Sequence, residues 1–216
     1  MKMKKLSLLV ATLALTVGLA GCMPGSNAKL PEGDVKVAKQ EIQGVVDLLL
    51  KSADYGKDES TVASILLPQD SQYNINVVME KYKDGKLVDT KEITNYTTEK
   101  IEKNSIVHMI LNVGKASDGE NSRSIYSIAE VDKEKTKDEK NPEYKLTKIN
   151  EHSLDYDVKS EVAQIGKNLD EEVTLAGYVK FKEDDTEKPA INLDTYKDEV
   201  SKYKEVSIVK MKVTKK

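Results

Sequence analysis

A stretch of alternating apolar and polar residues around one Asp-Gly pair is the strongest constraint on how this chain folds. The segment QYNINVVMEKYKDGKLVDTKEI, residues 72–93, alternates on both sides of Asp84-Gly85. One face of its first half would hold Tyr73, Ile75, Val77 and Met79. Successive side chains of a strand point to opposite faces, and Asp-Gly is a preferred pair for a tight hairpin turn. The sequence therefore predicts an antiparallel β-hairpin.

Further strands are predicted downstream by the same two-residue period. They cover residues 105–113, 122–131, 144–149, 172–181 and 205–213. Residues 105–113 are apolar on both faces, which is typical of a strand inside a sheet. The polar loop GKASDGEN then joins this strand to the next as a second hairpin with a longer turn. Residues 60–68 fit a short helix or a strand equally well.

Helices are predicted where apolar residues recur at steps of three and four. The clearest such stretch is residues 34–53, with Asp34 as its N-cap and Gly56 just past its end. Its apolar stripe would consist of Val35, Ala38, Ile42, Val45 and Leu49. Residues 158–169 predict a second helix, and Thr195 with Asp198 resembles a capping box that opens a third over residues 196–203. The expected fold class is α+β: an N-terminal amphipathic helix packed on a mostly antiparallel β-sheet, with one or two short helices near the C-terminus.

The beginning of the chain has the three parts of an export signal. A basic start, MKMKK, precedes the apolar run LSLLVATLALTVGLA, which ends in small residues. The run is too short for a transmembrane helix, which needs about 20 apolar residues. Gly21 follows this run, and Cys22 after it is the only cysteine of the chain.

Leu19, Ala20, Gly21 and Cys22 resemble the lipobox of bacterial lipoproteins. The resemblance implies that residues 1–21 are a signal peptide and that Cys22 becomes a diacylglyceryl cysteine at the mature N-terminus, so that it would be labelled by palmitate. Two acyl chains hold a protein at a membrane stably, whereas one gives only marginal binding. Residues 22–33, which include Pro, Gly, Ser and Asn, would form a flexible tether, and residues 34–216 a single extracytoplasmic domain.

The composition restricts the function classes. With no cysteine after Cys22, disulfides, thiolate zinc sites and cysteine nucleophiles are excluded from the mature chain. Charged residues make up 33% of the chain, yet the net charge is only −3, and loss of the three signal-peptide lysines makes it −6. This balance argues against nucleic acid as a partner. No cofactor is expected.

The candidates for chemistry are few, because the chain has only two histidines. His152 lies close to Asp155 and Asp157 in EHSLDYD, the one local group that could ligate a metal or act in acid-base catalysis. Turn residues of this kind more commonly bond to backbone, so these three are weak candidates and no metal site is predicted. His108 lies in the middle of a predicted strand, where a hydrogen-bonded, partly buried histidine is the expected state.

Two other patterns have a binding interpretation and a structural one. Residues 132–143 are rich in acidic side chains but lack the glycine and glutamate of a calcium loop, which favours a solvated loop. Ten tyrosines stand against one phenylalanine and no tryptophan. The tyrosines expected at element ends, where they could anchor a binding surface, are Tyr55, Tyr82, Tyr96, Tyr144 and Tyr156. The alternative is that tyrosine replaces Phe and Trp in the core.

Taken together, the sequence predicts a membrane-anchored lipoprotein on the extracytoplasmic face of a bacterial cell membrane. The favoured function is a non-enzymatic binding or accessory protein of the cell envelope, whose partner is an envelope protein or a small ligand. The alternative is an envelope hydrolase or metal-dependent enzyme that uses His152, Asp155 and Asp157. The binding residues and the ligand are not identified by the sequence.

Overall fold

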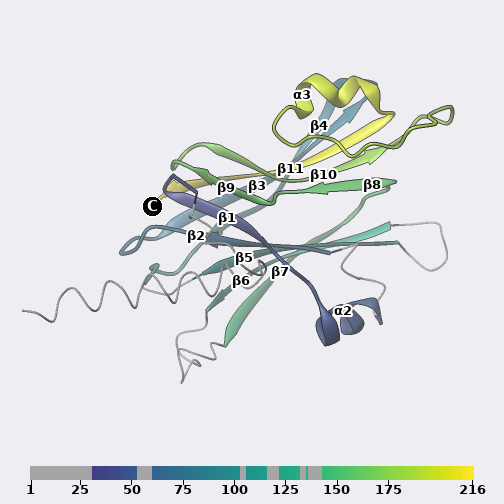
Figure 1. Ribbon diagram of the computed structural model, residues 1–216. Coiled ribbons are helices and arrows are strands. Elements are labelled where there is room, and N and C mark those ends of the chain that lie inside the picture. The colour runs from purple at the N-terminus through teal and green to yellow at the C-terminus, as the bar shows by residue number, and fades with distance from the viewer. Residues whose placement is uncertain (1–30, 53–59, 103–105, 116–121, 132–134, 136–142) are drawn as a thin grey trace, which may run out of the picture.

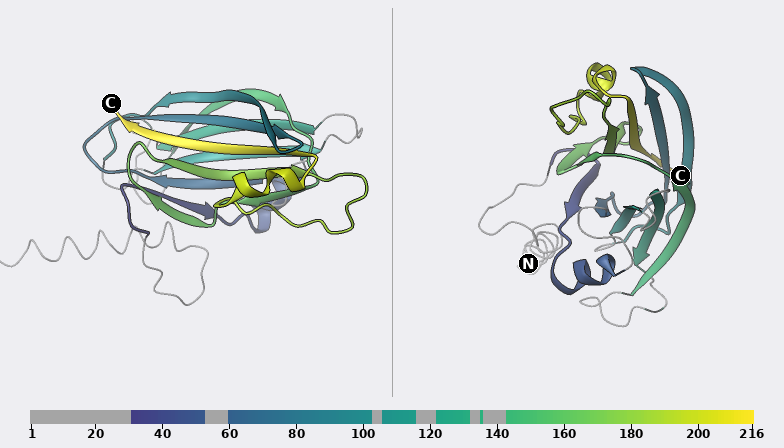
Figure 2. Two further views of the ribbon diagram at one scale, coloured as in Figure 1. Left: turned by 90° about the horizontal axis from the view of Figure 1, so that it is seen from above. Right: turned by 90° about the vertical axis from the view of Figure 1, so that its right-hand side faces the viewer.

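The computed structural model describes residues 31–52, 60–102, 106–115, 122–131, 135 and 143–216. These residues form eleven strands, two short α-helices and one 3-10 turn. All strand pairs are antiparallel, and the strands form two sheets that lie face to face as a sandwich (Figures 1 and 2).

The first sheet, called sheet A, has six strands in the order β7-β6-β5-β2-β1-β9. Its strands are β1 (Val35–Gln40), β2 (Ser60–Leu66), β5 (Val107–Lys115), β6 (Ser122–Val131), β7 (Tyr144–Ser153) and β9 (Gln164–Lys167). Sheet B has five strands in the order β4-β3-β11-β10-β8. Its strands are β3 (Tyr73–Lys83), β4 (Lys86–Thr97), β8 (Val158–Glu161), β10 (Glu172–Lys180) and β11 (Glu205–Lys215).

The main core lies between the two sheets. The inward side chains of both sheets form one continuous hydrophobic cluster, which includes the fully buried Ile65, Leu111, Ile75, Leu175 and Met211. At one side of the sandwich the chain passes directly from β8 in sheet B to β9 in sheet A through buried Val162. The β8–β9 corner therefore joins the two sheets covalently, and it also forms one wall of the candidate site.

The hairpin expected around Asp84-Gly85 is confirmed. Strands β3 and β4 pair antiparallel along almost their whole length, and Asp84 and Gly85 both have positive φ, as a tight hairpin turn requires. The predicted inward face is also correct, because Tyr73, Ile75 and Met79 are each at most 1% exposed.

Most of the other predicted strands are also present. β5 lies between β6 and β2, so the strand with two apolar faces is indeed internal to its sheet. β5 and β6 pair as the second hairpin. Residues 60–68, which the sequence left open, form the strand β2 rather than a helix. The acidic loop 132–143 lies almost wholly outside the described residues.

The expected fold class is wrong, because no N-terminal amphipathic helix packs on a sheet. Residues 35–40 form β1, and only Gly44–Lys51 form a helix, α2. Val35 and Val37 are buried on the same face of β1, a two-residue period that the helical reading overlooked. Gly44 has a φ of 60°, a conformation that fits glycine and interrupts a continuous helix. The described part of the chain is a mostly antiparallel β-sandwich.

The helix expected over residues 158–169 is also wrong. That stretch forms β8 and β9, two strands of four residues that belong to different sheets. The spacing of Val158, Val162 and Ile165 reflects the turn between the two strands, not one face of a helix. The third helix exists in shortened form as α3 (Tyr196–Glu199), followed by the 3-10 turn η1 (Val200–Lys202). The Thr195 side chain makes no capping hydrogen bond to the helix backbone.

Residues 181–204 cross the outer face of sheet B and are called the arm. The arm contains α3 and η1 and lies over β10 and β11 (Figure 2). It encloses a second hydrophobic cluster with Val179, Val206 and Ile208 of the sheet. Gly177 lets the arm come close, because a Cβ atom there would lie 2.8 Å from Ile191 Cγ2. Sheet B is therefore covered on both faces where the arm lies.

Candidate functional site

A cleft of about 580 Å³ opens beside the arm. Its walls are the arm at Ile191–Lys197, the β8–β9 corner, and the start of β10 with the neighbouring part of β11. β9 leaves β10 to pair with β1, so the two strands separate between the Val162–Leu175 backbone hydrogen bond and the turn at residues 168–171. The cleft forms because the consecutive strands β8 and β9 belong to different sheets.

Lys210 provides the buried charge of the cleft. Its side chain is 7% exposed, and its ammonium lies 2.6 Å from Glu80 Oε1 and 2.8 Å from Glu172 Oε2. The two glutamates come from β3 and β10, the strands on either side of β11. Burial alone would lower the pKa of Lys210, but its hydrogen bonds and charge interactions with Glu172 and Glu80 outweigh burial and hold that pKa above its usual value.

Two tyrosines complete this group and tie it to the arm. Tyr82 on β3 and Tyr196 on α3 each donate a hydroxyl hydrogen bond to Glu80 Oε2, at 2.7 and 3.0 Å. Burial would raise the pKa of Glu80, but the hydrogen bonds from Lys210 and Tyr82 hold it below its usual value. Burial and the Glu80 charge raise the pKa of Tyr196 to about 12. We call Lys210, Glu80, Glu172, Tyr82 and Tyr196 the Lys210 cluster.

A second charged group lies at the other wall of the cleft. Glu161, at the end of β8, pairs with Lys39 of β1 and with Lys159, whose Nζ is 2.6 Å away. Its Oε1 also accepts a 2.5 Å hydrogen bond from Thr61 of β2. Burial would raise the pKa of Glu161, but these hydrogen bonds lower it. Glu161 thus links sheet B to sheet A by charge, at the same corner where the chain links them covalently.

The buried Tyr178 lies behind this second group. Its hydroxyl is fully buried and has no hydrogen-bond partner among the described residues, and its ring packs edge-on against Tyr156 with centroids 5.2 Å apart. Burial, together with Tyr126, Tyr156 and the Glu161 charge, raises the pKa of Tyr178 well above its usual value. Tyr178 is therefore a neutral core residue.

Of the three weak candidates His152, Asp155 and Asp157, the structure describes the side chains of the two aspartates. Asp155 pairs with Lys180. Asp157 Oδ2 accepts the Phe181 backbone N–H at 2.9 Å, and the Asp157 N–H donates to Val179. His152 lies in β7, and its side chain is outside the described set. No group of three metal-ligating side chains occurs among those described. Both carboxylates have the structural role of turn residues.

His108 has the structural state that the sequence predicted. It is partly buried on the outer face of β5, its Nδ1 lies 2.8 Å from the Ser64 hydroxyl oxygen, and Tyr144 packs edge-on against its ring at 5.4 Å. Burial lowers the pKa of His108, which favours the neutral ring at neutral pH.

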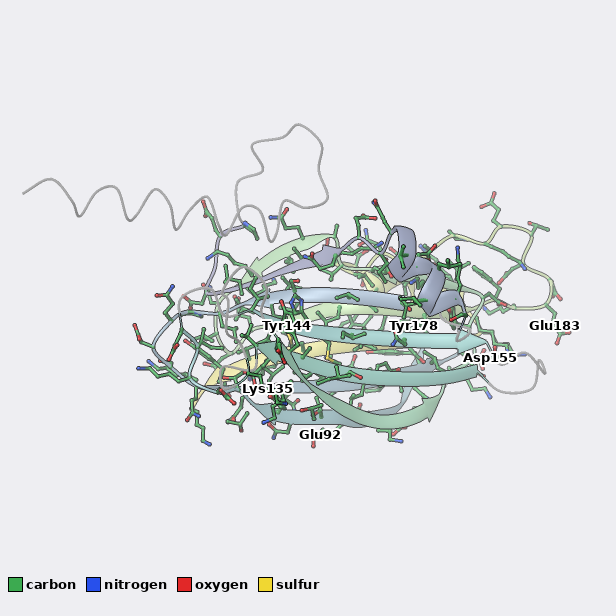
Figure 3. The ribbon with its side chains drawn as sticks, turned by 90° about the horizontal axis from the view of Figure 1, so that it is seen from below. Glu92, Lys135, Tyr144, Asp155, Tyr178 and Glu183 are labelled. Carbon is green, nitrogen blue, oxygen red and sulfur yellow. The ribbon has the colours of Figure 1, made fainter. Side chains whose placement is uncertain are left out.

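The tyrosines mostly belong to the core. Of those predicted at element ends, Tyr156 is buried, Tyr82 and Tyr96 are partly buried, and Tyr144 is 47% exposed. Tyr55 lies outside the described residues. Figure 3 labels Tyr144, which lies on sheet A, and Asp155, which lies at the end of the sandwich near Glu183 of the arm. The interpretation of tyrosine as a replacement for Phe and Trp fits better than a continuous tyrosine binding surface.

The sequence reasoning missed the Lys210 cluster. One signal was available, because Lys210 lies between the apolar residues Val209 and Met211 in the middle of a predicted strand. Its partners could not be identified in this way, since Glu80 lies more than a hundred residues earlier and reaches Lys210 only through the β3–β11 register.

The anchor residues Leu19, Ala20, Gly21 and Cys22 lie outside the described residues. Within the described part of the chain, none of the helices has the length and apolar character needed to cross a membrane. Comparison of the chain with protein-family models, curated proteins and solved structures found no significant match.

Proposed function

We propose that this chain is a lipid-anchored binding or accessory protein of the bacterial cell envelope, which holds an envelope protein or a small polar ligand in the cleft. The observation that carries the proposal is the cleft with the Lys210 cluster in its wall. The anchor rests on the resemblance of residues 19–22 to a lipobox. We place the protein on the extracytoplasmic face of the membrane.

The charges of the cleft favour binding over acid-base catalysis. A general acid or base works best when its pKa lies near the working pH. In the Lys210 cluster the pKa of the ammonium is raised, that of Glu80 is lowered, and that of Tyr196 is raised to about 12. These groups therefore keep fixed protonation states near neutral pH. Fixed charges and hydroxyl groups suit recognition of a polar surface.

The anchor is tested by the Cys22→Ala variant. We expect wild-type protein to incorporate labelled palmitate and to pellet with membranes, and Cys22→Ala to do neither and to keep its signal peptide. Labelling that persists in Cys22→Ala would refute the lipid anchor.

The cleft is tested by filling it. Ala163 is exposed, lines the cleft at the β8–β9 corner and is not part of the Lys210 cluster, so Ala163→Arg would occupy the space from the opposite wall. Thr90→Arg, on the exposed part of β4, is the matched control. The measurement is affinity purification of lipidated protein from its own membranes after mild crosslinking, followed by a thermal-shift screen of polar metabolites.

We expect a partner or ligand that is retained by wild type and Thr90→Arg and lost from Ala163→Arg. Equal retention by both variants would show that binding occurs elsewhere and would refute the cleft as the site.

A further inference from the structure

The helix α2 exposes the side that an amphipathic helix normally buries. Its Val45, Leu48 and Leu49 are 71%, 67% and 64% exposed, among the most exposed large apolar residues of the described chain. α2 connects β1 to β2 and stands away from the sandwich at one end of sheet A (Figures 1 and 2). In water this arrangement leaves the apolar stripe uncovered.

A helix as short as α2 is not stable in water by itself. Isolated helices shorter than about 12 residues are marginal in water, and most helical stability in proteins comes from packing an apolar face. α2 has eight residues and no side-chain N-cap. Its apolar face therefore needs a cover from outside the sandwich.

A second exposed apolar group lies on the outer face of sheet A, toward the end of the sheet away from α2. On β7, Tyr144 and Leu146 are 47% and 51% exposed. The strand register places Leu146 beside Ala129, and Ala129 beside His108, on this face. The arm covers the corresponding face of sheet B, but no described element lies across this side of sheet A (Figure 2).

We infer that α2 docks on the membrane surface, with its apolar stripe in the interfacial region of the bilayer. The inference rests on the lipid anchor of the proposed function. Between Cys22 and Val35 the chain spans at most about 45 Å when extended, whereas β1 carries the chain only about 20 Å from Val35 to its end near α2. The tether is therefore long enough for α2 to reach a bilayer that holds Cys22.

The charges of α2 fit a neutral bilayer. Asp47 and Lys51 form an ion pair with 2.8 Å between Oδ2 and Nζ, so the polar side of the helix carries no net charge. Burial of an apolar stripe at the interface is favourable in proportion to its area, and attraction to anionic lipids adds to it only when the helix is basic. Docking should therefore occur on phosphatidylcholine without anionic lipid.

A single-tryptophan reporter tests the docking, since the chain contains no tryptophan. Leu48→Trp places the probe in the stripe, and Leu87→Trp places it on β4, where Leu87 is 53% exposed. Each lipidated variant is reconstituted in phosphatidylcholine vesicles with or without brominated acyl chains, which quench nearby tryptophan. We expect quenching of Trp fluorescence in the Leu48 variant to exceed that in the Leu87 variant at least about twofold.

The outcomes separate the anchor from the docking surface. Palmitate labelling with equal quenching in both variants would overturn the docking and keep the anchor. A blue shift in Leu48→Trp without bromolipid quenching would also overturn it, because a protein would then cover the stripe. If Leu48→Trp in a form without residues 1–22, which has neither signal peptide nor acyl chains, still binds vesicles and is quenched, the docking holds without the anchor.

Discussion

The two sheets of this molecule present opposite kinds of outer face. Sheet B carries the arm, a second hydrophobic cluster and the Lys210 cluster on its outside, so its residues there are buried and paired. Sheet A carries no such layer in the described chain, and Tyr144 and Leu146 remain about half exposed. A two-sheet sandwich folds around its inner faces. The arm outside sheet B is therefore not needed to form the main core. The covered outer face of sheet B holds the cleft. The uncovered outer face of sheet A remains accessible to a membrane or to another protein.

The largest expected difference between the two outer faces is in the free energy of unfolding that is lost when a large apolar side chain is replaced by alanine. Ile208 is fully buried under the arm, so Ile208→Ala should lower the free energy of unfolding by roughly 4 kcal/mol through lost transfer energy and a cavity. Leu146→Ala on the open face should cost less than about 0.5 kcal/mol. Urea unfolding of both variants measures the contrast. Equal losses would mean that the two outer faces are covered alike.

The next effect concerns the buried ammonium. Lys210→Met should destabilise the fold by about 2 kcal/mol, below the usual cost of breaking a wholly buried pair. The cost is reduced because Glu172 stays half exposed and Glu80 keeps two tyrosine hydroxyls. Lys212→Met, two residues later on β11, is the control and should change the unfolding midpoint little. A Lys210→Met midpoint equal to that of the control would show that the cluster contributes nothing to attachment of the arm.

Acid should weaken the Glu161 connection between the sheets. The pKa of Glu161 is lower in the folded state than its ordinary value of 4.5, so its contribution to stability is complete above pH 4.5 and is lost as pH falls through the folded pKa. Glu161→Gln should therefore flatten the loss of thermal stability below pH 4.5. Glu183→Gln, an exposed arm residue, should leave that slope unchanged. Parallel slopes in wild type and Glu161→Gln would contradict the assignment.

The smallest expected effect is on α2. Val45→Ser together with Leu49→Ser should change the free energy of unfolding by less than about 0.5 kcal/mol, because both side chains are already in water. The thermal melting temperature in detergent-free buffer measures this in a form without residues 1–22, which carries neither the signal peptide nor acyl chains. A large loss of stability would mean that the stripe packs on the protein itself.

The sequence predicted the strands whose information is local. The β3–β4 hairpin follows from one Asp-Gly pair and a two-residue period, and β5 follows from its two apolar faces. The helices were predicted less accurately. Val35, Ala38 and Ile42 fit a helical spacing, whereas in the strand β1 it is Val35 and Val37 that lie on the same buried face. Tertiary pairing with β2 and β9 decided between the two periods.

The cleft could not be predicted because it depends on pairings between distant segments. Glu80, Glu172 and Lys210 come from three strands that are far apart in the sequence and adjacent in sheet B. Glu161 faces the cleft because the chain changes sheets after β8, where the sequence suggested a helix. No periodicity in a single sequence encodes which strands become neighbours.

The position of β11 also determines when this protein can fold. The last strand of the chain lies inside sheet B, hydrogen-bonded to β3 on one side and β10 on the other. Until residues 205–215 have been synthesised, β3 and β10 have no partner between them, and the arm has no complete surface to cover. Long-range pairing of this kind makes folding slow. A chain that lacks residues 205–215 lacks the strand that joins the two parts of sheet B, so it cannot complete the sandwich.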